Sequence, residues 1–291
     1  MNEHVTQSFY WSLRRELWEN RSLYIAPVIV ALVLLFGFVI SMHSLPSRMS
    51  VAADLGPTGE RAILARPYAT TAFLMVMIAF IIGAFYCLDA LHGERRDRSI
   101  LFWKSLPVSD RTIVLSKAAV PLVILPLFVF ALILAIQLAM LLLSTIALLG
   151  NSPSLMTLWA QLPLVKMTLA LIYALVAIAL WHAPIYGWLL LVSGWAKRAA
   201  FLWAFLPVML IFFFETIAFR TSHFVLLLRY RLFGWFTQAF APEARYSFAA
   251  EPLKALDPLK FITTPGLWVG LLFAAAFIAA AIRMRRHREA I

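Results

Sequence analysis

Four polar side chains stand inside otherwise apolar stretches of this 291-residue sequence, where they could take part in chemistry or in structure. They are Asp89, Gln137, His182 and Glu215. Such groups are costly in hydrocarbon unless they face a protein interior or water, so each is a candidate for a substrate pathway or a proton relay. For Gln137 the structural interpretation is a hydrogen bond between helices.

The other three also have structural interpretations. Asp89 lies near the end of its apolar run and can reach headgroup water. Glu215 is followed five residues later by Arg220, so it can form a structural pair or line an outer cavity as readily as it can contact substrate. His182 stands beside Pro184 and can bind a carbonyl that the proline leaves free. These alternatives stay open at the level of sequence.

Motifs for enzymatic chemistry are missing from the sequence. The single cysteine, Cys87, excludes an intrachain disulfide and a cysteine-based zinc or redox motif. The sequence contains neither Gly-x-x-x-x-Gly-Lys-Ser/Thr, which would cradle ATP phosphates, nor His-Glu-x-x-His, and Ser193-Gly194 lacks the context of a nucleophile elbow. We therefore expect no catalytic residues, no metal and no cofactor in this chain.

The polar segment 88–111 is the most informative stretch, because it alternates charges with large apolar residues. Asp97 or Ser99 can cap a short helix that Pro107 ends. Exposed apolar side chains on such a helix suit a groove on a partner protein. Equally, Phe102 and Trp103 could anchor the helix to the membrane surface, where aromatic side chains are common.

This segment resembles the cytoplasmic signature of ABC-2 type permeases. The similarity rests on Glu94-Arg95, Ser99, the run 105–109 (Ser-Leu-Pro-Val-Ser) and Lys117, in the same order and spacing. The departure is Arg98, where the family has glycine, so the backbone turn there can differ. The six-span layout, the amphipathic N-terminal segment and the basic end are also similar.

The resemblance implies a permease without a nucleotide site. It implies pairing with a second permease copy, as a homodimer or a heterodimer, and binding of two ATPase subunits, which hold ATP and Mg, through a coupling helix in this loop. Glu94 would orient that helix through Arg95, Arg98 or a basic side chain of the partner. The residues expected to couple to the ATPase are Glu94, Arg95, Arg98, Ser99, Ile100, Leu101, Trp103, Leu106 and Pro107.

The elements that carry these residues are apolar helices. With 63% hydrophobic and 13% charged residues, the chain is far more apolar than a soluble domain. Runs of about twenty apolar residues match the length that crosses a bilayer. We therefore predict an all-α polytopic membrane protein whose domain 23–282 has six transmembrane helices, at about 23–42, 70–91, 115–149, 162–192, 199–219 and 265–282.

Other segments lie outside these crossings. Residues 1–22 are expected to form an amphipathic helix on the membrane surface, and 283–291 a basic tail. The block 115–149 is too long for one straight crossing, and Pro121 and Pro126 predict a kink. Residues 223–236 predict an external re-entrant or interfacial helix, because Arg229 and Arg231 disfavour a crossing.

Lys and Arg number 15 on the side of both termini and 10 on the other, which predicts cytoplasmic termini in the inner (cytoplasmic) membrane. Because the basic residues sit at helix ends, the net charge of +11 does not indicate nucleic-acid binding. The predicted function is export of a hydrophobic or amphipathic substrate. An ion-coupled secondary transporter and a non-transporting membrane anchor for an ATPase remain alternatives.

Overall fold

Long apolar helices dominate the computed structural model, which describes residues 2–54, 56–97, 99, 108–149, 152–242 and 249–287. Within these ranges the only β contact is an isolated bridge between Phe240 and Leu256. The same ranges contain six helical stretches that are long and apolar enough to cross a membrane: Ser22–Ser44, Gly56–Arg96, Asp110–Ala147, Leu155–Trp195, Ala200–Phe219 and Pro265–His287. The prediction of an all-helical, membrane-embedded chain with six apolar helices is confirmed at this level.

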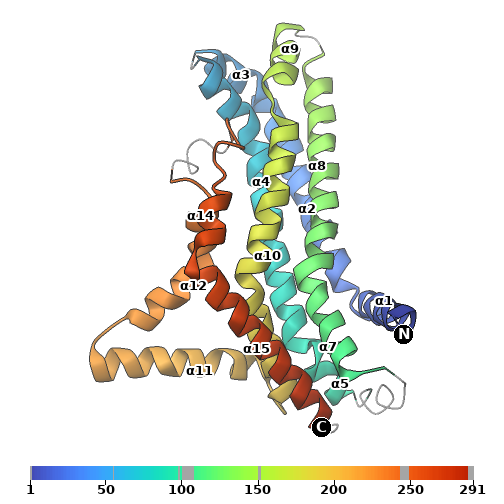
Figure 1. Ribbon diagram of the computed structural model, residues 1–291. Helices are drawn as coiled ribbons and strands as arrows, with labels where there is room; N and C mark the ends of the chain where they lie inside the picture. The colour runs from blue at the N-terminus through green and yellow to red at the C-terminus, as the bar shows by residue number, and fades with distance from the viewer. Residues whose placement is uncertain are drawn as a thin grey trace.

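Three long helices form the centre of the molecule. Helices α4 (Gly56–Ala90), α8 (Leu125–Ala147) and α10 (Leu164–Trp195) run side by side, and α2 (Ser22–Ser41) packs on α4 and α8 (Figure 1). At 1.5 Å per residue, α4 is about 52 Å long, well beyond the roughly 30 Å of hydrocarbon. The predicted span 70–91 is therefore one part of a helix that begins fourteen residues earlier.

Prolines act differently in the third and fourth long segments. The third consists of α7 (Asp110–Ala119), a π-helical turn Val120–Ile124 that contains Pro121, and then α8, so regular α-helix is interrupted where a kink was predicted. In the fourth, a short helix α9 (Ser152–Gln161) precedes α10, which continues through Pro184 without a break. Pro184 therefore does not divide the helix that corresponds to the predicted span 162–192.

Both chain termini lie at one end of the bundle, which we call the terminal end (Figure 1). Helix α1 (Asn2–Glu19) and the short helix α5 (His92–Arg96) lie at this end, and α1 packs against α7. Helix α3 (Leu45–Ala53), which follows a 3₁₀ turn at Met42–Ser44, and α9 lie at the opposite end.

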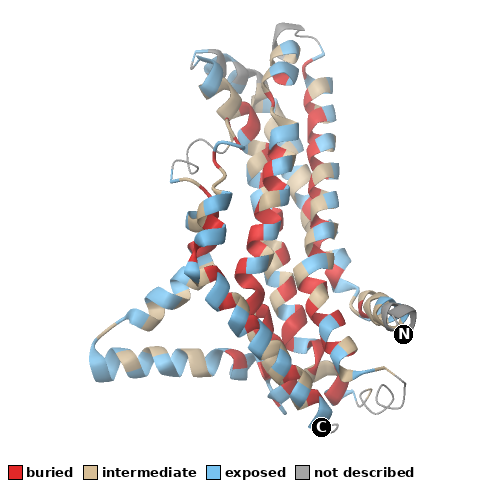
Figure 2. Cartoon of the chain, in the orientation of Figure 1, coloured by how far each residue is buried: buried red, intermediate tan, exposed pale blue. Residues whose placement is uncertain are grey.

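The last third of the chain departs from a simple row of crossings. Helix α11 (Ala200–Phe214), extended by a π-helical turn Glu215–Phe219, runs across the direction of α4, α8 and α10 (Figure 1). Helix α12 (His223–Ala239) returns from its outer end to the bundle, and α14 (Pro258–Thr263) follows. Most of α11 is exposed (Figure 2), and its length and composition alone qualify it as a span.

The final helix, α15 (Pro265–His287), packs along α10, and small residues allow this contact. A Cβ atom at Gly187 would lie 3.2 Å from the carbonyl oxygen of Ala274 and 3.3 Å from Cβ of Phe277. Small residues let helix backbones approach closely in membranes. This contact holds the end of α15 beside α5 and α7.

Candidate functional site: a buried ion cluster at the terminal end

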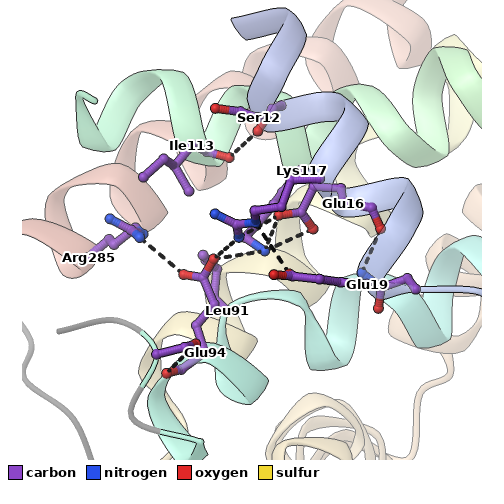
Figure 3. A network of polar contacts seen from close by, with 12 residues as sticks. Ser12, Glu16, Glu19, Leu91, Glu94, Ile113, Lys117 and Arg285 are labelled. Carbon is purple, nitrogen blue, oxygen red and sulfur yellow. Dashed lines mark hydrogen bonds and ion pairs between the residues drawn. The ribbon is translucent and has the colours of Figure 1, made fainter. Parts of the chain in front are cut away.

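Glu94 lies at the centre of a group of charged side chains at the terminal end (Figure 3). Its Oε1 accepts a hydrogen bond from Nη2 of Arg15 at 2.6 Å and lies 3.2 Å from Nζ of Lys117. Its Oε2 accepts from Nη2 of Arg285 at 3.1 Å. One carboxylate on α5 therefore contacts cations from α1, α7 and α15.

Glu16 is the second carboxylate of the group. Lys117 donates to both of its side-chain oxygens, at 2.8 and 3.0 Å, and the hydroxyl of Tyr86 donates to Oε2 at 2.7 Å. Arg15 donates to Oε1 at 2.9 Å. Because Tyr86 belongs to α4, Glu16 joins helix α1 to two of the long helical segments.

Arg285 extends the cluster to the start of α7, where it forms an ion pair with Asp110. Asp110 is the first residue of that helix, and the preceding Ser109 caps it by accepting a hydrogen bond from the Thr112 amide at 3.1 Å. A carboxylate in the first turn and a serine cap are the residues that favour a helix start. The start of α7 is therefore held by a serine cap and by an ion pair.

The burial of these side chains determines how much the loss of one charge would cost in stability. The exposed fractions of Glu16, Lys117, Arg285 and Glu94 are 1%, 2%, 4% and 8%. Exposed ion pairs contribute little, whereas removal of one partner from a buried pair leaves an uncompensated charge. We call the side chains of Arg15, Glu16, Glu94, Asp110, Lys117 and Arg285 the ion cluster.

At its edge, on α1, the cluster is partly open to solvent. Glu19 pairs with Arg15 at 3.3 Å, and burial raises the pKa of Glu19 above its ordinary value against the opposing effect of Arg15. Burial disfavours the charged form of Arg15, but Glu16, Glu94 and Glu19 together outweigh it and raise the pKa of Arg15. The arginine therefore stays charged.

Backbone contacts fix α5 to the end of α10. The hydroxyl oxygen of Ser193 accepts from the amides of Leu91 and His92, at 2.9 and 2.8 Å. Arg95 donates to the carbonyl oxygens of Gly194 and Ala196, at 2.9 and 3.2 Å. The segment that begins the predicted coupling loop is therefore attached to α10 as well as to the helices of the ion cluster.

Most of the predicted coupling helix lies outside the described residues. This holds for Arg98, Ile100, Leu101, Trp103, Leu106 and Pro107. Ser99 donates from its hydroxyl to the carbonyl oxygen of Glu94 at 3.3 Å. Asp97 follows the last residue of α5, so α5 ends before the helix start predicted at 97–99.

The four polar residues predicted within the spans lie apart from one another. Asp89 is exposed at the terminal end, with its carboxylate 3.6 Å from Nη1 of Arg96. Gln137 is buried, and its amide donates to the carbonyl oxygen of Tyr68 at 3.4 Å, between α8 and α4. Gln137 thus joins α8 to α4, and Asp89 lies at the surface of the molecule beside Arg96.

His182 and Glu215 both contact α12. The Nδ1 of His182 lies 3.0 Å from the carbonyl oxygen of Ile178, and its Nε2 lies 3.1 Å from that of Leu232. Pro184 would free the carbonyl of residue 180, four positions earlier, so His182 contacts different carbonyls from the predicted one. It attaches α12 to α10.

Glu215, in the turn that extends α11, contacts the start of α12. Its carboxylate accepts from the hydroxyl of Thr221 at 2.8 Å and from the amides of His223 and Phe224 at 2.7 and 2.8 Å. A carboxylate that accepts the first amide hydrogens of a helix satisfies groups that have no partner inside the helix. The position gives Glu215 a capping contact, which the predicted pairing with Arg220 did not anticipate.

Several cluster members were not predicted as site residues. Arg15 and Arg285 were counted only among the basic residues that predict the orientation, and Asp110 was considered only as a helix cap. Glu16 and its partner Tyr86 were not singled out. One signal was present: Glu16 follows Phe9 by seven residues and Leu13 by three, so it shares the apolar face of α1. A carboxylate on the buried face of a surface helix requires a cation from another element.

The arrangement joins α1, α5, α7 and α15, and its groups are already paired with one another. Within the described ranges, no group of three or more His, Cys, Asp or Glu residues is placed to hold a metal ion. No protein-family model matches the chain, and a comparison with curated proteins also finds no match.

Proposed function

We propose that the chain is the transmembrane permease subunit of an ABC transporter, driven by a separate ATPase that docks on the 94–109 loop. The observation that supports this most directly is the position of Glu94. It stands at the base of the loop and contacts cations of α1, α7 and α15. A push or pull on the loop would therefore reach three helices through one buried side chain.

The ion cluster suits this role because it is stiff and connected. Buried charged pairs are held by short hydrogen bonds and resist separation. Ser193 and Arg95 attach the same segment to α10. In the proposed mechanism, closure of two ATPase subunits on ATP moves the loops of two permease copies, and the helices switch between inward-open and outward-open or laterally open forms.

Other parts of the proposal follow from the sequence. The chain contains no phosphate-binding loop, so ATP and Mg would be held by the partner. A second copy of the chain would complete the transporter as a homodimer in the inner membrane, with both termini cytoplasmic and export of a hydrophobic or amphipathic substrate. An anchor that recruits an ATPase without transport would use the same loop.

The ion-coupled alternative has weaker support. A proton relay needs titratable groups that follow one another along a path through the membrane. Asp89 is exposed beside Arg96, His182 contacts backbone carbonyls of two helices, and Glu215 caps α12. These three residues lie in separate environments, which favours the ATPase-driven proposal.

The test is a pull-down combined with an ATPase assay on purified protein in nanodiscs. Leu101→Ala with Trp103→Ala removes two large apolar side chains, each worth about 1.5–3 kcal/mol when buried in an interface. Loss of about 3 kcal/mol lowers affinity roughly a hundredfold, so the double variant should insert normally but lose the co-purifying ATPase.

The matched control is Met156→Ala with Trp159→Ala, two exposed side chains of α9 at the opposite end. This variant should retain the ATPase. If wild-type protein brings down no ATPase, or if the loop variant binds it as well as wild type does, the proposal fails. The ion-coupled transporter would then be tested by transport under an ion gradient.

A further inference from the structure

A large cavity lies away from the ion cluster, between α4, α8, α10 and the end of α12. Its volume is about 490 Å³, within the roughly 300–1,000 Å³ range of ligand pockets. Most of its lining is apolar and includes Phe73, Val76, Ile178, Trp235 and Phe236. None of the ion-cluster residues lines it, so it is a separate feature of the bundle.

The position of the cavity along α4 gives its depth. The α4 residues that line it run from Ala62 to Val76, and Arg66 lies one turn before the predicted start of the hydrocarbon at Thr70. Arg66 to Val76 corresponds to about 15 Å along the helix, and Thr70 to Val76, the part inside the predicted hydrocarbon, corresponds to about 9 Å of its roughly 30 Å. The cavity therefore extends from the predicted headgroup level partway into one leaflet.

Positive charge gathers at the shallow end. Arg66 also lines a neighbouring cavity of about 460 Å³, together with Arg48. Both arginines are exposed, and no carboxylate of the described residues forms an ion pair with either of them. Guanidinium groups bind phosphate and carboxylate strongly, by paired hydrogen bonds.

The deeper part of the cavity is lined by one polar side chain that is held in place by a hydrogen bond. Gln137 lines the cavity although it is only 3% exposed, and its amide nitrogen is held by the carbonyl of Tyr68. No described residue donates a hydrogen bond to its side-chain oxygen. A pocket of apolar walls with a few placed polar groups is the usual form of a small-molecule site.

We propose that this cavity binds an anionic membrane lipid, with an acyl chain against Phe73, Val76 and Ile178 and the headgroup at Arg66 and Arg48. The depth suits the upper part of an acyl chain, and the charge matches a phosphate or carboxylate headgroup. That this lipid is the exported substrate rests on the proposed function, whereas its binding does not.

The experiment uses the full-length protein in phosphatidylcholine nanodiscs with a trace of phosphatidylglycerol that carries a photoreactive diazirine in one acyl chain. Crosslinked peptides are mapped by mass spectrometry. We expect labelling of the α4 and α10 segments that contain Phe73, Val76 and Ile178. The same diazirine on phosphatidylcholine should label these segments about tenfold less, the ratio that one charge-assisted contact of 1.4 kcal/mol provides.

Two variants and a control make the test specific. Arg66→Gln changes an exposed side chain and should lower the phosphatidylglycerol labelling of these segments about tenfold. Ala69→Phe, which fills the cavity wall, should lower labelling with both lipids. Arg229→Gln removes an exposed arginine that does not line the cavity and should leave labelling unchanged.

Equal labelling of the cavity by both lipids, or unchanged labelling in Arg66→Gln, would overturn the proposal. So would labelling confined to the exposed face of α11. The result is independent of the ATPase pull-down. Cavity labelling without a co-purifying ATPase would leave lipid binding in place and reject the transporter proposal. An ATPase without cavity labelling would reject the lipid site alone.

Discussion

Lys117 donates hydrogen bonds to both carboxylate oxygens of Glu16, at 2.8 and 3.0 Å, although 101 residues separate them in the chain. Both side chains are almost fully buried. The pair holds the N-terminal helix α1 against the start of the third long segment. Glu94 lies 3.2 Å from the same ammonium group, so the loop that follows it is held by the same contact.

Loss of the lysine charge should destabilise the fold. Lys117→Met leaves Glu16 and Glu94 buried near one another with less compensation, which we expect to cost about 3–5 kcal/mol. Thermal unfolding in detergent measures the effect. The exposed Lys197→Met, which is also near the terminal end, should change stability little. An unfolding temperature of Lys117→Met equal to that of wild type would contradict the buried pairing.

The two partners should also depend on each other energetically. Glu16→Gln alone leaves Lys117 with one fewer carboxylate, while Glu16→Gln with Lys117→Met removes both charges of the pair. Residues in one ion network show coupling energies of about 0.5–3 kcal/mol. The double variant should therefore be less destabilised than the sum of the single variants. Glu251→Gln, whose carboxylate pairs with Lys254 outside the ion cluster, serves as the control and should combine additively with Lys117→Met.

Glu94 should connect ATP hydrolysis to transport in the proposed complex. Glu94→Gln keeps the shape of the side chain but removes the charge that attracts Arg15, Lys117 and Arg285. We expect the ATPase to remain bound while substrate movement per ATP hydrolysed falls. A reconstituted transport assay with parallel phosphate release measures both. An unchanged ratio of transport to hydrolysis would remove Glu94 from the coupling path.

The contact between α10 and α15 should tolerate no large side chain at Gly187. A Cβ there already lies 3.2 Å from the Ala274 carbonyl oxygen, so Gly187→Leu must push the helices apart. Overpacking of this kind costs about 1–3 kcal/mol. Gly37→Leu is the control, because no atom lies within 4 Å of a Cβ at that position. Comparison of the two unfolding temperatures checks the prediction.

Glu215 should stabilise the first turn of α12. Glu215→Ala removes the acceptor of the His223 and Phe224 amides, so hydrogen exchange at these amides should accelerate. Glu215→Gln keeps one carbonyl oxygen and should accelerate exchange less. Equal protection of these amides from exchange in wild type, Glu215→Ala and Glu215→Gln would mean that the carboxylate does not cap the helix.

The predicted orientation can be tested with an impermeant thiol reagent in intact cells. Cysteines at Asp97 and His287, near the terminal end, should be shielded, whereas a cysteine at Thr58 should react. The native Cys87 is buried and should contribute little background. Reaction at position 97 in sealed cells would reverse the topology and remove the basis for a cytoplasmic coupling loop.

The sequence by itself determined the class of the protein. Apolar runs of about twenty residues can only satisfy their backbone groups in a membrane as helices, so composition and run length sufficed to predict six apolar helices. Pro121 similarly predicted the interruption before α8, since its missing amide breaks the local hydrogen-bond pattern. These are local properties that need no knowledge of neighbours.

Only the tertiary structure decided which charges meet. Arg15, Glu94, Lys117 and Arg285 come from four distant segments, and basic residues at helix ends look alike in sequence whether they face headgroups or a buried carboxylate. The direction of α11 was likewise undetermined, because an all-apolar helix carries no periodic face that says what it packs against. Pairing and packing depend on helices brought together through space, and that information is not local to any one of them.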